Sequence, residues 1–69
     1  MSCEEKERLL KEYQATTRNF AASVDELHRR MGTSSLHEYQ QRQRTTEEAR
    51  LKSELARLAL EHHVATHQC

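Results

Sequence analysis

The sequence contains no proline, no tryptophan and no isoleucine, and it has a single glycine among its 69 residues. Leu, Val and Phe together supply only 11 residues, and chains this short rarely build a self-sufficient core without a metal, a disulfide or a partner chain. The formal net charge is zero, because 11 basic side chains balance 11 acidic ones. Proteins that bind nucleic acid by neutralising phosphates usually carry a basic excess, so this balance argues against that function.

The sequence also lacks any apolar run long enough to cross a bilayer, so we expect no membrane span. Three of the first six residues are charged and the segment has no apolar core, unlike a signal peptide. We therefore expect a cytoplasmic protein in which Cys3 and Cys69 are reduced thiols. A glycine-rich phosphate loop is missing, and the closest catalytic constellation, Cys3 beside His63 or His67, has no substrate pocket or oxyanion donors. The sequence therefore predicts no enzyme activity.

The abundant residues are those of long helices. Ala, Glu, Lys, Leu and Arg make up 36 of the 69 positions, which is typical of long helices or coiled coils. The one strong interruption is the segment 31–35, which contains Gly32. A glycine in this place suits the left-handed position that follows many helix ends. The composition and the single interruption predict an all-α chain made of two helices and one turn.

Two capping boxes fix where the helices begin. Ser2 with Glu5, and Ser35 with Glu38, have the spacing that starts a helix. The Thr-Thr-Glu-Glu segment at 45–48 resembles a further start, so the second helix has an alternative form that is kinked or begins late. No nearby residue breaks a helix, and we expect continuity. The predicted fold is one coiled-coil-like antiparallel hairpin over residues 1–69, with a first helix at about 3–31, a turn at 32–35 and a second helix at about 36–67.

Apolar residues follow each helix with the period of helix packing. In the first helix, the 3–4 spacing is the one that knobs-into-holes packing requires. One seam position of this helix holds Cys3, Leu10, Thr17, Val24 and Met31, and the other holds Lys6, Tyr13, Phe20 and Leu27. In the second helix, a stripe of mostly small residues is predicted to face the first. This stripe consists of Tyr39, Thr46, Ala49, Ser53, Ala56, Leu60 and Val64.

A second stripe lies nearly opposite on the second helix. It consists of Leu51, Leu55, Leu58, His62 and Cys69. A two-helix hairpin buries only one of the two stripes, and an exposed apolar patch usually marks an interface. We therefore expect a homodimer in which two hairpins form a four-helix bundle, with the three leucines at the interface and His62 at its rim. The alternative is partial burial of the leucines against the flank of the first helix, which carries Leu9, Ala21 and His28.

The open end of the predicted hairpin gathers the residues that bind metals. Folding about the turn brings Cys3 level with the end of the second helix, where His63 and His67 share one helix face. Together with Cys69 they would complete a Cys2His2 set, which is typical of zinc. Two alternatives remain open. One is a disulfide between Cys3 and Cys69 or between chains, and the other is a pair of exposed chain ends with no shared role.

These features predict a non-catalytic protein-interaction or self-assembly module, whose partner is a second copy or another helical protein. The alternative is a dimeric RNA-binding hairpin. That architecture is similar to the plasmid Rop proteins, although no stretch of residues matches them. The arginines of the second helix, Arg42, Arg44, Arg50 and Arg57, do not form one basic face, and Arg50 and Arg57 share their side with glutamates.

Overall fold

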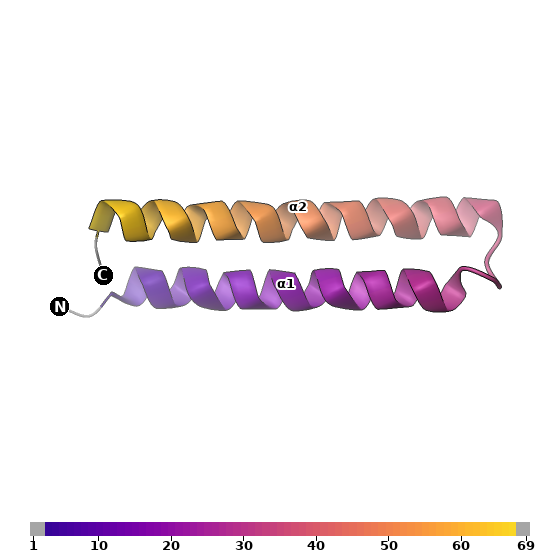
Figure 1. Ribbon diagram of the computed structural model, residues 1–69, viewed down its shortest axis with the longest axis horizontal. Coiled ribbons are helices and arrows are strands. Elements are labelled where there is room, and N and C mark those ends of the chain that lie inside the picture. Colours follow the sequence, from indigo (N-terminus) through magenta and orange to yellow (C-terminus); the bar gives the residue numbers. More distant parts are fainter. Residues whose placement is uncertain (1–2, 68–69) are drawn as a thin grey trace.

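The computed structural model describes residues 3–67, which form two long antiparallel helices (Figure 1). Helix α1 spans Glu4–Arg30 and helix α2 spans Leu36–His67. The two pack side by side along their whole length, in a hairpin that measures 53 × 14 × 11 Å. The predicted two-helix, all-α hairpin is thereby confirmed. Neither α1 nor α2 contains an apolar stretch that is long enough to cross a membrane.

Helix α1 begins one residue after its predicted start. The carbonyl of Cys3 accepts a hydrogen bond from the backbone N–H of Glu7 at 3.2 Å, but the Cys3 side chain makes no capping bond. Three glutamates occupy the first turn, where the positive end of the helix dipole stabilises them. Ser2, the first residue of the predicted capping box, lies outside the described residues.

The backbone of Met31, the first residue after α1, has the right-handed helical conformation. Met31 has φ −58° and ψ −38°, and Gly32 does not adopt the left-handed conformation that the sequence predicts for it. The reason is in the hydrogen bonds. The carbonyl of Arg30 accepts from the N–H groups of Thr33 and Ser34 at 3.2 and 3.0 Å. Because these two bonds already satisfy the last carbonyl of α1, the turn needs no left-handed residue there.

Helix α2 starts as predicted and runs without a break. The backbone N–H of Glu38 donates to the Ser35 hydroxyl at 3.2 Å, which confirms the Ser35 cap. The hydroxyls of Thr45 and Thr46 donate to the carbonyls four residues earlier, at 3.1 and 2.9 Å. Each threonine therefore satisfies its hydroxyl inside a continuous helix and does not cap a new one.

The face of α2 that packs on α1 is the predicted one. Ala56 is buried, and the rest of the stripe is half-buried except for Val64, which is exposed. On α1, the seam position that holds Lys6, Tyr13, Phe20 and Leu27 is also half-buried, as predicted.

The other seam position of α1 is only partly as predicted. Cys3 and Val24 are half-buried, as expected, but the neighbouring position takes the place of Leu10 in the contact. Leu9 is buried with 8% of its surface exposed, whereas Leu10 and Met31 are 41% and 54% exposed. Thr16 and Ser23, seven and fourteen residues after Leu9, continue this half-buried seam. Thr16 and Ser23 are small, and so are Ala49 and Ala56 on the facing side of α2. Because small side chains cover little of their neighbours, Leu9 and Ala56 are the only buried residues among those that the structure describes.

Side-chain hydroxyl groups form hydrogen bonds between the two helices. The hydroxyls of Thr17 and Ser53 lie 2.9 Å apart, and Thr46 also donates to the carbonyl of Ser23 at 3.4 Å. Each bond adds little to stability, because water competes for the same groups in the unfolded chain. The hairpin is thus held by a narrow contact with few large apolar side chains.

Candidate functional site

The most exposed apolar surface of the hairpin lies on α2. We call it the leucine face, and it consists of Leu51, Leu55, Leu58 and His62. The three leucines are 51%, 66% and 50% exposed, and His62 is exposed beside them. Helix α1 does not cover this face. Of the three flank residues that the sequence offered as cover, Leu9 is buried in the seam, whereas Ala21 and His28 are themselves exposed.

Ion pairs border one edge of the leucine face. Arg57 pairs with Glu54 at 2.9 Å and with Glu61 at 2.7 Å, and Arg50 pairs with Glu47 at 3.1 Å. The hydrogen bond from Arg57 lowers the pKa of the Glu54 carboxyl below its ordinary value of 4.5. A polar edge beside an apolar centre is the usual anatomy of a protein–protein interface.

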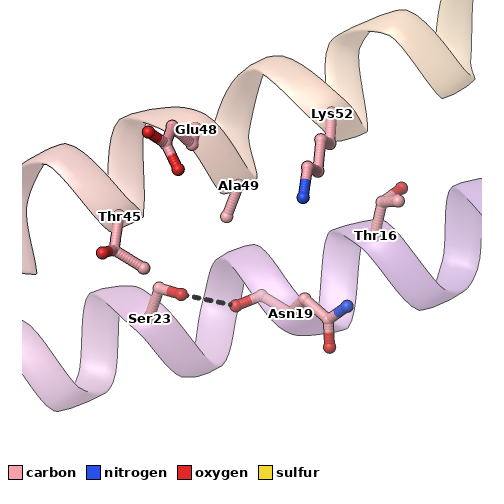
Figure 2. Close-up of a pocket in the computed structure, with 7 residues that line it drawn as sticks. All are labelled: Thr16, Asn19, Ser23, Thr45, Glu48, Ala49 and Lys52. Atoms are coloured by element: carbon pink, nitrogen blue, oxygen red, sulfur yellow. Dashed lines mark hydrogen bonds between the residues drawn. The ribbon is translucent and has the colours of Figure 1, made fainter.

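A groove between the two helices borders the opposite edge, and Figure 2 shows its central part. The Ser23 hydroxyl donates to the carbonyl of Asn19 at 2.9 Å, and the Lys52 side chain reaches down toward α1. This central part has a volume of about 210 Å³. It is lined by Thr16, Asn19, Ser23, Thr45, Glu48, Ala49 and Lys52.

The groove continues in both directions along the hairpin. Toward the open end, a hollow of about 370 Å³ shares Thr16 and Lys52 with the central part and adds Leu55, Ala56 and Ala59. Toward the turn, a third hollow of about 250 Å³ includes Ala22 and Arg42. We call these three hollows together the small-residue groove, although its lining is of two kinds. Small side chains form its floor: Thr16, Ala22, Ser23, Thr45, Thr46, Ala49, Ala56 and Ala59. Longer, mostly charged side chains complete the lining: Glu12, Asn19, Glu26, Arg42, Glu48, Lys52 and Leu55. Leu55 therefore belongs both to the groove wall and to the leucine face.

An unpaired donor lies at the turn end of this groove. The Nη1 atom of Arg42 is buried and has no hydrogen-bond partner among residues 3–67. A buried donor without an acceptor costs free energy, so a partner that brings an acceptor would recover it. Sequence reasoning missed the groove, although the small side chains of Thr16 and Ser23, at helix spacing, were the available signal.

The open end brings together three of the four predicted metal ligands. The Sγ atom of Cys3 lies 3.0 Å from Nε2 of His63, across the hairpin. The His63 and His67 rings have their centroids 4.5 Å apart. Cys69, the fourth predicted ligand, lies outside the described residues. The structure thus places Cys3 and the two histidines in one cluster, as the hairpin geometry requires.

The chemical state of Cys3 differs from the expected one. Cys3 is disulfide-bonded, so its sulfur is not the reduced thiol that the charged N-terminal residues suggested. Among residues 3–67, no three His, Cys, Asp or Glu side chains are arranged to hold a metal ion. Nearby, a hydrogen bond from Arg8 is the main cause that lowers the pKa of the Glu5 carboxyl, and the charges of His63 and His67 contribute to a lesser extent.

Glutamates engage five of the eight arginines. Arg30 pairs with Glu26 at 2.7 Å, as the i,i+4 spacing suggests, and Arg29 shares the same carboxylate at 2.6 Å. Arg8 contacts Glu5 and Glu12. These exposed pairs contribute little to stability individually, but they distribute both signs of charge along the two helices.

No protein-family model, curated protein or solved structure matches the chain.

Proposed function

We propose that this chain is a non-catalytic self-assembly module, in which two hairpins pair through the leucine face to form a four-helix bundle. The observation that carries the proposal is the exposure of Leu51, Leu55 and Leu58 beside a groove that both small and charged side chains line. A stripe of this kind on a short chain is typical of an interface. The occupant we infer is a second copy of the same chain.

The accessible surface supports a large partner. The hairpin exposes 5511 Å² for a mass of 8.1 kDa. A compact folded chain of this mass exposes about 4,500 Å² by the usual scaling. The excess of roughly 1,000 Å² is comparable with the ~800 Å² that each partner buries in a standard interface. A second hairpin would cover such an area, whereas a small ligand would not.

The shape of the surface favours an identical partner. Every copy carries a ridge of leucines and, adjoining it at Leu55, the small-residue groove. Two copies related by a two-fold axis would each insert the ridge into the partner's groove, which is the reciprocal contact of a symmetric dimer. Burying the exposed half of each leucine contributes about 1 kcal/mol, or on the order of 6 kcal/mol per dimer before the cost of association.

The test is the mass of the protein in solution, measured by analytical ultracentrifugation at micromolar concentration. We expect the wild type to sediment as a dimer and Leu55→Asp to shift the population to monomer, because the aspartate would be desolvated at the interface. The matched control is Leu36→Asp. Leu36 is 73% exposed but lies at the start of α2, far from the leucine face, so this variant should remain a dimer.

A folded wild-type monomer at this concentration would contradict the proposal and leave a different helical protein as the candidate occupant. A Leu55→Asp variant that remains a dimer would also contradict it. The RNA-binding alternative has no specific observation in its favour, since ion pairs with glutamates engage five of the eight arginines.

A further inference from the structure

We infer that the two α2 helices of the dimer run antiparallel, with Glu48 of each copy paired to the partner's His62. This inference rests on the proposed self-assembly through the leucine face and deepens it. It names the two residues that set the orientation of the second copy and its register along α2.

Glu48 and His62 flank Leu55, the most exposed leucine of the leucine face, at equal distances along α2. Each lies seven residues from Leu55, which is about 10 Å along a helix. Seven residues turn an α-helix by about 700°, so each lies within about 20° of the direction of Leu55. Both side chains are exposed. A carboxylate and an imidazole therefore stand on one line, with the leucine at its centre.

The Glu48 carboxylate makes no ion pair within the described chain, unlike Glu54 and Glu61 on the other edge of the face. Its expected partner within α2 is Lys52, four residues later. Lys52 instead points toward α1, as Figure 2 shows. The His62 ring also has no ion pair with a described residue. Both groups can therefore pair with another chain.

A two-fold axis that passes Leu55 at right angles to α2 brings these groups together. In an antiparallel pair about this axis, the residue seven positions before Leu55 lies level with the residue seven positions after it in the partner. Glu48 of each copy then meets the partner's His62, and Leu51 lies level with the partner's Ala59. A histidine donates a hydrogen bond to a carboxylate whether its ring is neutral or protonated. Two such pairs would close both ends of the leucine contact.

The same two residues disfavour a parallel dimer. A two-fold axis along the helices would place Glu48 against the partner's Glu48, and His62 against the partner's His62. Two carboxylates in contact repel each other, as do two protonated histidines. Charge complementarity therefore selects the antiparallel partner. It also sets the register, because a shift along α2 would separate both pairs.

The experiment is a charge exchange, with the Kd of the dimer measured by sedimentation equilibrium of the full chain at pH 7. His62→Glu should raise the Kd about tenfold, because two carboxylates then meet at each end of the contact. Glu48→Lys should also raise it, because it removes both pairs. In the double variant Glu48→Lys/His62→Glu, the new lysine meets the partner's new glutamate. Its Kd should return to within about threefold of the wild-type value.

The recovery can arise only between copies, because positions 48 and 62 of one chain are fourteen residues apart, or roughly 21 Å along the helix. The matched control is Glu38→Lys/His62→Glu, which has the same composition and net charge as the exchange variant. Glu38 is exposed in the first turn of α2, far from the leucine face. This control should therefore dimerise as weakly as His62→Glu. Circular dichroism checks that every variant remains helical.

The wild type is measured first. A monomeric wild type would contradict the proposed self-assembly, and the antiparallel pairing would fail with it. If the wild type is a dimer, an exchange variant that dimerises no better than the single variants overturns the pairing alone. In a parallel dimer the exchange variant would be the weakest of all, because like charges would meet at both positions. Recovery by the Glu38→Lys control would trace the effect to net charge and would also overturn the pairing.

Discussion

At the scale of single residues, Ser and Thr hydroxyls decide much of the local structure. Thr16, Ser23, Thr45, Thr46 and Thr66 each donate to the carbonyl four residues earlier. Such side chains compete with the helix for backbone partners and are weaker helix formers than alanine. Here the back-bonds satisfy them inside the helices. Thr16, Ser23 and Thr46 are half-buried between the helices. Because these side chains are small, the contact between the helices contains few large apolar groups.

Gly32 gives the first prediction at this scale. No atom lies within 4 Å of the position that a Cβ would occupy, and the residue does not need a left-handed conformation. Gly32→Ala should therefore stabilise the protein by about 0.4–1 kcal/mol, because alanine reduces the conformational freedom of the unfolded chain. Urea unfolding at fixed protein concentration measures the change. A loss of stability of about 1 kcal/mol or more would mean that Gly32 is left-handed in solution.

The sequence predicted those local features that follow from residue spacing alone. The Ser35 cap followed from its spacing to Glu38, and the approach of Cys3 to His63 followed from folding the chain about its one turn. The conformation of Gly32 was not predictable in this way, because it depends on which N–H groups reach the carbonyl of Arg30. For Cys3, the sequence favoured a reduced thiol and kept a disulfide as an alternative, and the structure has the disulfide. Residue counts could not decide between the two, since they do not report a redox state.

At the scale of the helices, the main departure from the prediction is that Leu9, and not Leu10, is buried in the α1 seam. Leu9 and Leu10 are adjacent and both apolar, so the heptad pattern alone did not decide which of them packs on α2. The structure buries Leu9 and aligns it with Thr16 and Ser23, so the small-residue groove forms beside the seam. The two helices and their lengths were predictable from the capping residues and the turn, and the packed face of α2 was predictable from periodicity. Which of the two leucines of α1 is buried depends on how the two helix surfaces fit.

A pair of substitutions tests which of these two leucines is buried. Leu9→Ala should cost about 2–3 kcal/mol, because it removes a buried side chain from a contact with little else to fill the gap. Leu10→Ala should cost less than about 1 kcal/mol, since Leu10 is 41% exposed. Urea unfolding of both variants at one protein concentration compares them directly. A greater loss for Leu10→Ala would restore the heptad that the sequence alone suggests.

At the scale of the whole molecule, the formal net charge is zero, and ion pairs place many of the opposite charges next to each other. Eleven carboxylates oppose eleven Lys and Arg side chains, and five histidines add positive charge only when they are protonated. Arg57 lies between Glu54 and Glu61, and its own pKa is raised, chiefly by hydrogen bonds to these two glutamates. Two hairpins can approach each other at neutral pH without strong repulsion because each carries no net charge.

Acid should remove the balance of charge, because it protonates the carboxylates. The direction of the resulting change in stability follows from the pKa values of the glutamates. Hydrogen bonds from Arg57 and Arg8 lower the pKa of Glu54 and Glu5 below 4.5. A carboxyl whose pKa is lowered by folding stabilises the fold above 4.5, and this contribution is lost as the pH falls through its folded-state value. The basic side chains and histidines are then unopposed. We therefore expect the melting temperature, followed by circular dichroism, to fall between pH 5 and pH 3, and the proposed dimer to dissociate.

The Glu54→Gln variant isolates one part of this effect. Glutamine at position 54 cannot lose a charge in acid, so the variant should be less stable than the wild type at pH 6 and should lose less stability between pH 6 and pH 3. Added salt should reduce the acid effect, because it screens repulsion between the two cationic hairpins. A wild-type melting temperature that stays constant from pH 6 to pH 3 would show that the ion pairs do not contribute to folding or assembly.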